Sequence, residues 1–364
     1  MTRQESPGGG RIAWLDLCKG LAMALVLVGH SMRDEMRSAS PALDFIYRSV
    51  YIFHMTWFFW MAGYTYRLAR DRGRPPVQTA MRRLKKQLWP WAAYTLLIYA
   101  LFSLAVRLPG VGGTLKSAGY APMPIGDYIL SALRADNPWA YHLWFLYVLM
   151  LLTLIVSLAD GAFGGRRLNV VCGALAILGL AGVAARGELA LGDWWRLYDY
   201  ITLYLPVFCL GTLMANMRPS WPALWAWGGA GFAYIMIRAA FFSGFSGNSL
   251  SVDSASGRFA LYLLADLLLP GLMLLLGRLF ETGILPRTGL AKRALSFLGR
   301  ESMLIYLLHQ PFCCAFLGLV LFSRLRLPAL PVMAVCLAAS VAVPWAAAWA
   351  RDRIRARRIQ NTKG

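Results

Sequence analysis

The chain has 364 residues, of which 58% are hydrophobic and 15% are charged, and its mean hydropathy is +0.52. A soluble domain of this length has no core large enough for so much apolar surface, so the composition excludes the soluble globular class and indicates an integral membrane protein. The formal net charge of +20 is spread over many connecting segments and is not gathered in one module. We therefore expect no nucleic-acid partner.

Ten apolar runs are long enough to cross a hydrocarbon layer of about 30 Å as helices, so we predict an all-α, polytopic membrane fold. These runs are residues 12–31, 46–66, 88–106, 143–159, 168–185, 197–215, 222–243, 259–279, 302–322 and 328–349. We assign residues 1–350 to a single transmembrane domain. The basic tail, residues 351–364, should lie on the anionic headgroups of membrane lipids.

The distribution of positive charge predicts the topology. If the N-terminus is cytoplasmic, 24 of the 37 Lys and Arg residues fall on the cytoplasmic side. Cytoplasmic segments of membrane proteins carry such an excess, so both termini are predicted to be cytoplasmic, in a multi-pass protein of the cell's inner (cytoplasmic) membrane. The longest predicted connections are residues 67–87 inside and residues 107–142 outside.

The first run contains three ionisable residues, Asp16, Lys19 and His30. Such residues are costly inside a membrane and are functional candidates by default. Lys19 and His30 are separated by three helical turns plus about 20°, and Asp16 lies about 40° short of four turns from His30. All three should share one helix face, with the lysine about 16 Å from the imidazole. That separation is close to the reach of an extended phosphopantetheine arm.

The chemistry of these side chains suggests separate roles. An imidazole can take a proton from a hydroxyl group or accept an acyl group itself, which makes His30 the catalytic candidate, with Asp16 on the same face. A buried lysine suits a phosphate or pyrophosphate. Alternatively, Lys19 and Asp16 form an ion pair within the helix that neutralises both, and the two roles of Lys19 can coexist.

Other ionisable residues follow along the chain. His54 lies in the second run and His142 opens the fourth, and each is either a hydrogen-bonded packing residue or a functional one. Arg238 is an intramembrane cation, which should face a polar cavity or form a structural ion pair. We treat these three residues as acceptor-side candidates.

The ninth run has a polar face of its own. Ser302, Tyr306 and His309 are spaced i, i+4 and i+7, which places them on one side of a helix. The chain has no H-E-x-x-H, G-x-S-x-G or Walker motif, and its histidines and carboxylates lack the spacing of metal ligands. We expect no metal and no tightly bound cofactor.

Several of these residues belong to motifs that follow one another along almost the whole chain. In this order they resemble the integral-membrane acyltransferase 3 family. The family often has arginine at the position of Lys19, and the lysine here resembles its fucose O-acetylase-like branch. Trp60-Met61 stands where the family often has Leu-Ser. The motifs are Leu15-Asp16-x-x-Lys19-Gly20 with His30, Phe53-His54-Met55 before Phe58-Phe59 and Gly63-Tyr64, Arg82-Arg83 before Trp89-Pro90, His142 to Tyr147, Leu205-Pro206 to Gly211, and Leu298-Gly299-x-x-Ser302 before Tyr306 and His309.

The resemblance implies about ten transmembrane helices and an acyl-CoA donor bound from the cytoplasm. It also implies transfer of a small acyl group, commonly acetyl, to a hydroxyl of a glycan, a lipid-linked sugar or a metabolite. The family's catalytic histidine falls on His30 and its basic motif residue on Lys19. The residues assigned to the donor, acetyl-CoA or another acyl-CoA, are Lys19, Arg82, Arg83, Ser302, Tyr306 and His309.

Two other functions are compatible with the composition. A secondary transporter also has many helices with buried Lys, Arg and His, although no internal repeat of the kind found in many transporters is visible. A non-catalytic membrane assembly factor is the second alternative. Neither predicts the ordered set of motifs.

Overall fold

The computed structural model describes residues 12–117, 120–164, 167–186, 188–241 and 254–361. Every regular element in these ranges is helical, which confirms the all-α prediction. Eight of the described segments are long and apolar enough to cross a membrane, as expected of a polytopic protein. They are Ala13–Ser31, Pro76–Ala105, Tyr141–Phe163, Leu168–Ala185, Gly192–Met214, Phe259–Glu281, Ser302–Arg324 and Ala329–Ile354.

Two of the ten predicted spans are absent from this set of eight. Residues 46–66 are helical within α3 (Pro41–Asp71), and residues 222–241 are helical within α10 (Trp221–Phe241). The count of ten spans and the cytoplasmic position of both termini therefore stay predictions. Arg3, Arg11, Arg166 and Lys363, which contribute to the charge argument, lie outside the described residues.

The chain forms two compact units. The first consists of the described parts of 1–55, 235–241 and 273–364, and the second of the described parts of 56–234 and 242–272. The helices α3, α10 and α11 (Ala255–Glu281) contribute residues to both units. Each unit is described separately below.

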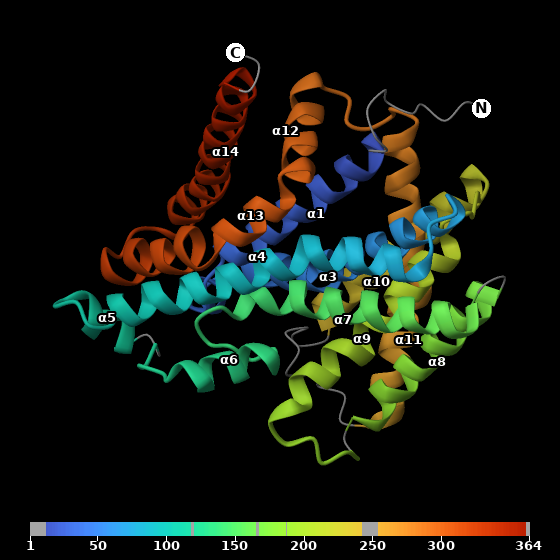
Figure 1. Cartoon of the computed structure of the whole chain (residues 1–364), viewed down its shortest axis with the longest axis horizontal. Helices are drawn as coiled ribbons and strands as arrows, with labels where there is room; N and C mark the ends of the chain where they lie inside the picture. Colours follow the sequence, from blue (N-terminus) through green and yellow to red (C-terminus); the bar gives the residue numbers. More distant parts are fainter. Residues whose placement is uncertain (1–11, 118–119, 165–166, 187, 242–253, 362–364) are drawn as a thin grey trace. The chain divides into compact units, whose positions relative to one another are not determined.

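In the first unit, α1 (Ala13–Ser31) packs along α12 (Gly289–Arg300), as Figure 1 shows for the blue and orange helices. Two glycines allow the close approach. A Cβ atom on Gly20 would lie 2.0 Å from the Leu295 carbonyl oxygen, and one on Gly299 would lie 1.8 Å from the Asp16 carbonyl oxygen. Because any side chain at these positions would collide with backbone, glycine is required for this crossing.

The predicted span 302–322 is not one continuous α-helix. The helix α13 (Ser302–Leu308) is followed by two π-helical segments, η5 (His309–Phe316) and η6 (Leu319–Arg324). Gln310 has an extended conformation, with φ −121° and ψ 148°. The cause is Pro311, because proline disfavours the α conformation in the residue before it and has no N–H to donate. The break leaves His309 at the end of α13.

The remainder of the first unit includes α2 (Asp34–Ser38) and α14 (Ala329–Asn361). Helix α14 continues through the start of the predicted tail without a break at residue 350, and Arg351 forms an ion pair with Glu301 at 3.0 Å. Methionine, cysteine and valine side chains from the end of α1, from α2, from η5 and from α14 form a buried core. Its members are Met32, Met36, Cys314, Val332, Met333 and Cys336.

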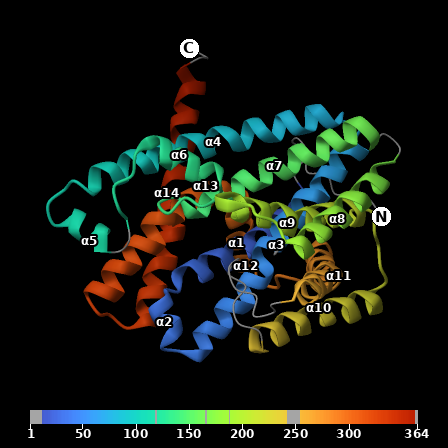
Figure 2. The ribbon, with the colours of Figure 1, turned by 90° about the horizontal axis from the view of Figure 1, so that it is seen from below.

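The second unit is built on α4 (Pro76–Ala105), α7 (Trp144–Ala159), α8 (Leu168–Ala185) and α9 (Trp195–Met214). Helices α4 and α7 run side by side, as Figure 2 shows, and α8 packs on α9. Shorter elements join them. These are α5 (Val111–Ser117), α6 (Ile125–Leu133), η1 (Tyr141–Leu143), η2 (Asp160–Gly164) and η4 (Gly192–Trp194).

The structure corrects the prediction of a long basic loop at residues 67–87. Helix α3 continues to Asp71 and α4 begins at Pro76, so the connection is a short turn. Polar helix turns extend beyond the apolar runs here, and hydropathy alone does not distinguish such turns from a loop. Arg82 and Arg83 accordingly lie on a helix.

Candidate active site

Three of the four histidines meet in the first unit, together with a tyrosine. His30 lies in the last turn of α1, Tyr51 and His54 lie on α3, and His309 lies at the end of α13. The ring centroids of His30 and His309 are 5.1 Å apart, and those of Tyr51 and His54 are 4.8 Å apart. The Tyr51 hydroxyl is 3.5 Å from His30 Nδ1. We call these four residues the histidine cluster.

Two of the imidazoles are fixed by backbone carbonyls. His54 Nδ1 donates to the Val50 carbonyl at 2.7 Å, and His309 Nδ1 donates to the carbonyls of Ile305 at 3.1 Å and Tyr306 at 2.8 Å. Because a carbonyl oxygen only accepts, Nδ1 carries the hydrogen and Nε2 is the acceptor nitrogen of each neutral ring. Both side chains are buried, so each ring is held in one tautomer and one orientation.

His30 has a different environment. It is partly exposed, and the hydrogen-bond partner near its Nδ1 is a hydroxyl group. A tyrosine hydroxyl can either donate or accept, so Tyr51 can support either tautomer of His30. Of the three clustered histidines, His30 is therefore the one best suited to change its protonation state during a reaction.

The other end of α1 carries the predicted ion pair. Lys19 Nζ is 3.9 Å from Asp16 Oδ1, and the lysine side chain is 36% exposed. The helix is continuous from Ala13 to Ser31, which puts Asp16 about 21 Å along the axis from His30. Direct contact between Asp16 and His30 is therefore excluded, and Asp16 can act only at the lysine end of the helix.

The other predicted residues of this unit have distinct surroundings. Tyr306 is buried, with its ring centroid 6.0 Å from that of His309, so it lies next to the histidine cluster. Ser302 is the first residue of α13 and is half-buried. Arg238, on α10, is 4% exposed. The assignments of Ser302, Tyr306 and His309 to the donor, and of His54 and Arg238 to the acceptor, stay predictions.

The remaining candidates belong to the second unit. His142, in η1, is buried, and its ring centroid is 6.3 Å from that of Tyr94. Arg83 donates to the Ala62 carbonyl at 2.9 Å and to Thr65 Oγ1 at 3.1 Å, whereas Arg82 is exposed. Arg83 thus joins α4 to α3. Any contact between Arg83 and a nucleotide would compete with these two hydrogen bonds.

Tyr51 is not among the residues predicted from the sequence, although the sequence contains a signal for it. Tyr47, Tyr51 and His54 are spaced i, i+4 and i+7, the same spacing that identified Ser302, Tyr306 and His309. The structure confirms the shared face, because Tyr47 stacks on Tyr51 with ring centroids 4.0 Å apart. Within the described residues, no group of three or more His, Cys, Asp and Glu side chains is arranged to hold a metal ion.

Comparison with protein-family models identifies the family of this chain. A family model for acyltransferase 3, described as an acyltransferase domain, matches residues 12–349. The searches of curated proteins and of solved structures gave no match. The matched region includes every residue of the histidine cluster as well as Asp16 and Lys19.

Proposed function

Because the chain belongs to the acyltransferase 3 family and is a multi-pass membrane acyltransferase for groups other than aminoacyl groups, we propose that it transfers acetyl from cytoplasmic acetyl-CoA. The acceptor is a hydroxyl group of a glycan, a lipid-linked sugar or a metabolite, and the host membrane is the cell's cytoplasmic membrane. The observation that carries this proposal is the position of His30 beside Tyr51 and His309.

His30 is the group that moves the proton. It takes the hydrogen of the acceptor hydroxyl, and the oxygen attacks the thioester carbonyl. The C–S bond then breaks, and the departing CoA thiolate takes the proton from the imidazolium. In the covalent alternative, an imidazole nitrogen of His30 attacks the thioester carbonyl, the C–S bond breaks, and the departing CoA thiolate takes the ring N–H proton. The acceptor oxygen then attacks the acyl-imidazole, the C–N bond breaks, and the acceptor's proton passes to the released imidazole.

The neighbouring residues position His30. Tyr51 orients the imidazole through its hydroxyl, 3.5 Å from Nδ1. His309 and His54 line the same space with neutral rings that the backbone keeps in one orientation. Neutral neighbours do not oppose the charge that His30 acquires, whereas a neighbouring cation would oppose it.

Lys19 holds a phosphate of the donor. It lies eleven residues before His30 on the same unbroken helix, which corresponds to about 16 Å. A lysine ammonium with a half-exposed side chain retains donors for a ligand even when it is paired with Asp16. The thioester of a CoA molecule bound there would reach the imidazole.

The deciding experiment measures the reaction directly. The purified wild-type protein in detergent is incubated with acetyl-CoA, and the release of CoA thiol is followed with and without glycan and lipid extract from the host cell. We expect release that depends on the extract. A transporter or an assembly factor would release none. Mass spectrometry of glycans and lipids from a deletion strain then identifies the species that has lost an acetyl group.

A further inference from the structure

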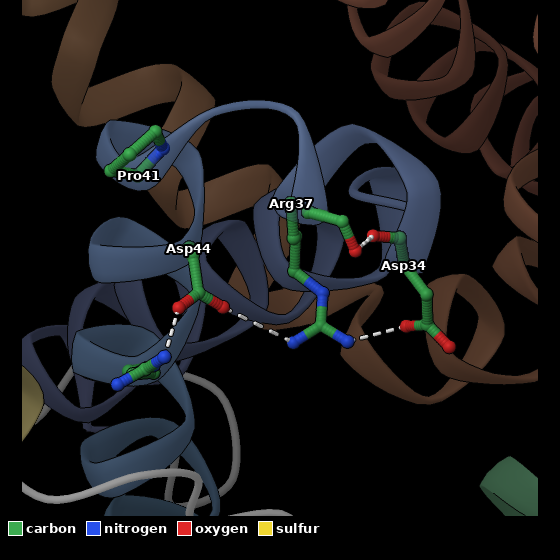
Figure 3. A pocket seen from close by; sticks show the side chains of 6 residues that line it. Asp34, Arg37, Pro41 and Asp44 are labelled. Carbon is green, nitrogen blue, oxygen red and sulfur yellow. Dashed lines mark hydrogen bonds and ion pairs between the residues drawn. The ribbon is translucent and has the colours of Figure 1, made fainter.

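A surface pocket opens at the His30 end of α1, where α2 meets the start of α3 within the first unit. Its volume is about 420 Å³, within the range of small-molecule sites. The walls are polar, and Figure 3 shows Arg37 between Asp34 and Asp44. The lining residues are Asp34, Arg37, Ser38, Pro41, Asp44 and Arg48.

The charges in the pocket are balanced. Arg37 pairs with Asp34 and, at 3.7 Å, with Asp44, and Arg48 pairs with the other oxygen of Asp44. Burial lowers the pKa of Arg37, but its hydrogen bond to Asp34 and its electrostatic interactions with Tyr47, Asp34 and Asp44 outweigh burial, so the pKa lies above its usual value. A phosphate needs cations that are not already neutralised, so these arginines are poorly suited to one.

The same groups suit an uncharged molecule with many hydroxyls. A carboxylate has about four acceptor positions and a guanidinium five donors, so each pair keeps hydrogen-bonding capacity beyond the ion pair itself. The Asp34 side chain is 90% exposed, which leaves it open to a ligand. Acceptors and donors therefore alternate around the pocket, as the hydroxyls of a sugar ring require.

One face of α3 leads from the pocket to the histidine cluster. Asp44, Tyr47, Arg48 and Tyr51 follow one another at helical spacing, so Tyr51 lies about 10 Å along the axis from Asp44. The Arg37 guanidinium lies 3.7 Å from the centre of the Tyr47 ring, and Tyr47 stacks on Tyr51. The contacts thus run without interruption from Arg37 to His30.

From this arrangement we infer that the pocket is an acceptor subsite for an uncharged, polyhydroxylated ring, such as a hexopyranose unit. Asp34, Arg37 and Asp44 bind this ring by hydrogen bonds, and a hydroxyl on a neighbouring unit of the same acceptor lies along Tyr47 and Tyr51 at His30. Groups bound away from the reacting atoms position those atoms for reaction. This inference rests on the proposed function, since it assigns the ring to the acceptor of that reaction.

The test uses the full-length protein in detergent with acetyl-CoA and four probes. Methyl β-maltoside and methyl β-lactoside are neutral glycosides with two rings, so one ring can occupy the pocket while the other reaches His30. Maltose 1-phosphate is anionic, and 1-decanol represents a lipid hydroxyl. The pocket variants are Asp44→Asn and Asp34→Asn, and the matched control is Asp127→Asn, an exposed carboxylate on α6. The readouts are CoA release against probe concentration, acetyl-CoA affinity by calorimetry, and the midpoint of thermal unfolding.

We expect at least one neutral glycoside to raise CoA release by the wild type. Asp44→Asn and Asp34→Asn should raise the half-saturating glycoside concentration by about tenfold to a hundredfold, with acetyl-CoA affinity unchanged. Asp127→Asn should behave as the wild type. Asp34→Asn remains informative if Asp44→Asn destabilises the unit, because its side chain is mostly exposed.

Several results would overturn the subsite. These are unchanged glycoside dependence in Asp34→Asn, stimulation by maltose 1-phosphate or 1-decanol alone, or a wild type that binds acetyl-CoA but responds to no neutral glycoside. In each of these cases the proposed acyltransfer stands. A wild type that binds no acetyl-CoA and releases no CoA contradicts the proposed function itself, and the subsite with it.

Discussion

The histidine cluster of the first unit and the buried carboxylate of the second show two different uses of polar groups inside a helical protein. The Asp160 side chain has no exposed surface, and Tyr66 and Arg70 donate to it at 2.7 and 2.6 Å. A charge and its donors satisfy one another there, as buried ionic groups must. The histidine cluster instead brings neutral rings together around one partly exposed imidazole.

The difference shows that burial of ionisable residues does not by itself mark a site. Both regions hold several such residues on neighbouring helices. In the second unit the contacts stabilise the ends of α3 and α7, whereas in the first unit they leave His30 with a hydroxyl partner that adapts to either tautomer. Substitutions in the two regions should therefore affect different properties.

The largest expected effect is on catalysis. His30→Ala removes the group that moves the proton, so CoA release should fall by about 10²–10⁴-fold while the midpoint of thermal unfolding stays near that of the wild type. The control is Asp127→Ala, which removes an exposed carboxylate of the second unit and should retain the activity. If His30→Ala keeps more than roughly a tenth of the activity, the catalytic role moves to another histidine.

Asp160→Ala should lower the free energy of unfolding, by about as much as His30→Ala raises the activation free energy of the reaction. It leaves the buried Tyr66 hydroxyl and Arg70 without their acceptor, so we expect a loss of about 3–5 kcal/mol in the free energy of unfolding. Thermal and denaturant unfolding in detergent measure it, with Asp127→Ala as the exposed control. Activity per folded molecule should be unchanged, and a specific loss of activity would contradict the structural role of this carboxylate.

His309→Phe tests whether the cluster positions His30. The ring volume is nearly kept, but the hydrogen bonds to Ile305 and Tyr306 are lost. We expect kcat to fall by up to about 10²-fold with little change in the KM for acetyl-CoA, because positioning acts on the reacting geometry. The more conservative His309→Gln should recover part of kcat. A change confined to KM would instead support the predicted donor role of His309.

The smallest expected effect concerns the donor. Lys19→Met combined with Asp16→Leu removes both members of the ion pair, so no buried carboxylate is left uncompensated. If Lys19 binds a CoA phosphate, acetyl-CoA affinity should fall by about tenfold to a hundredfold, the range for a charged hydrogen bond. Calorimetry decides between the roles, because unchanged affinity would mean that Lys19 only neutralises Asp16. Lys19→Arg should keep most of the affinity.

Much of the first helix could be predicted from the sequence. The spacing of Asp16, Lys19 and His30 indicated one helix with an ion pair at one end, and the structure confirms both. The break at Gln310 could also have been predicted, because the residue before a proline avoids the helical conformation. The loop prediction at 67–87 was wrong because charged helix turns and loops have similar composition.

The meeting of His54 and His309 beside His30 could not be predicted in this way. Helical spacing shows which residues share a face, but it does not show which faces of distant helices pack together. That outcome depends on tertiary contacts such as the crossing of α1 and α12. The motif glycines at this crossing, Gly20 and Gly299, have no chemistry of their own, and the spacing of ionisable residues gives no reason to select them.

The crossing at Gly20 and Gly299 also limits how the two ends of α1 can communicate. Backbone meets backbone at both positions. A one-residue slide or a rotation of α1 would bring a side chain into the contact, where there is room only for the α-hydrogen atoms of glycine. Helix α1 is therefore locked in register against α12. A one-residue slide of α1 past α12 therefore cannot carry a signal from occupancy at Lys19 to His30, whereas a CoA molecule that binds at both ends joins them directly.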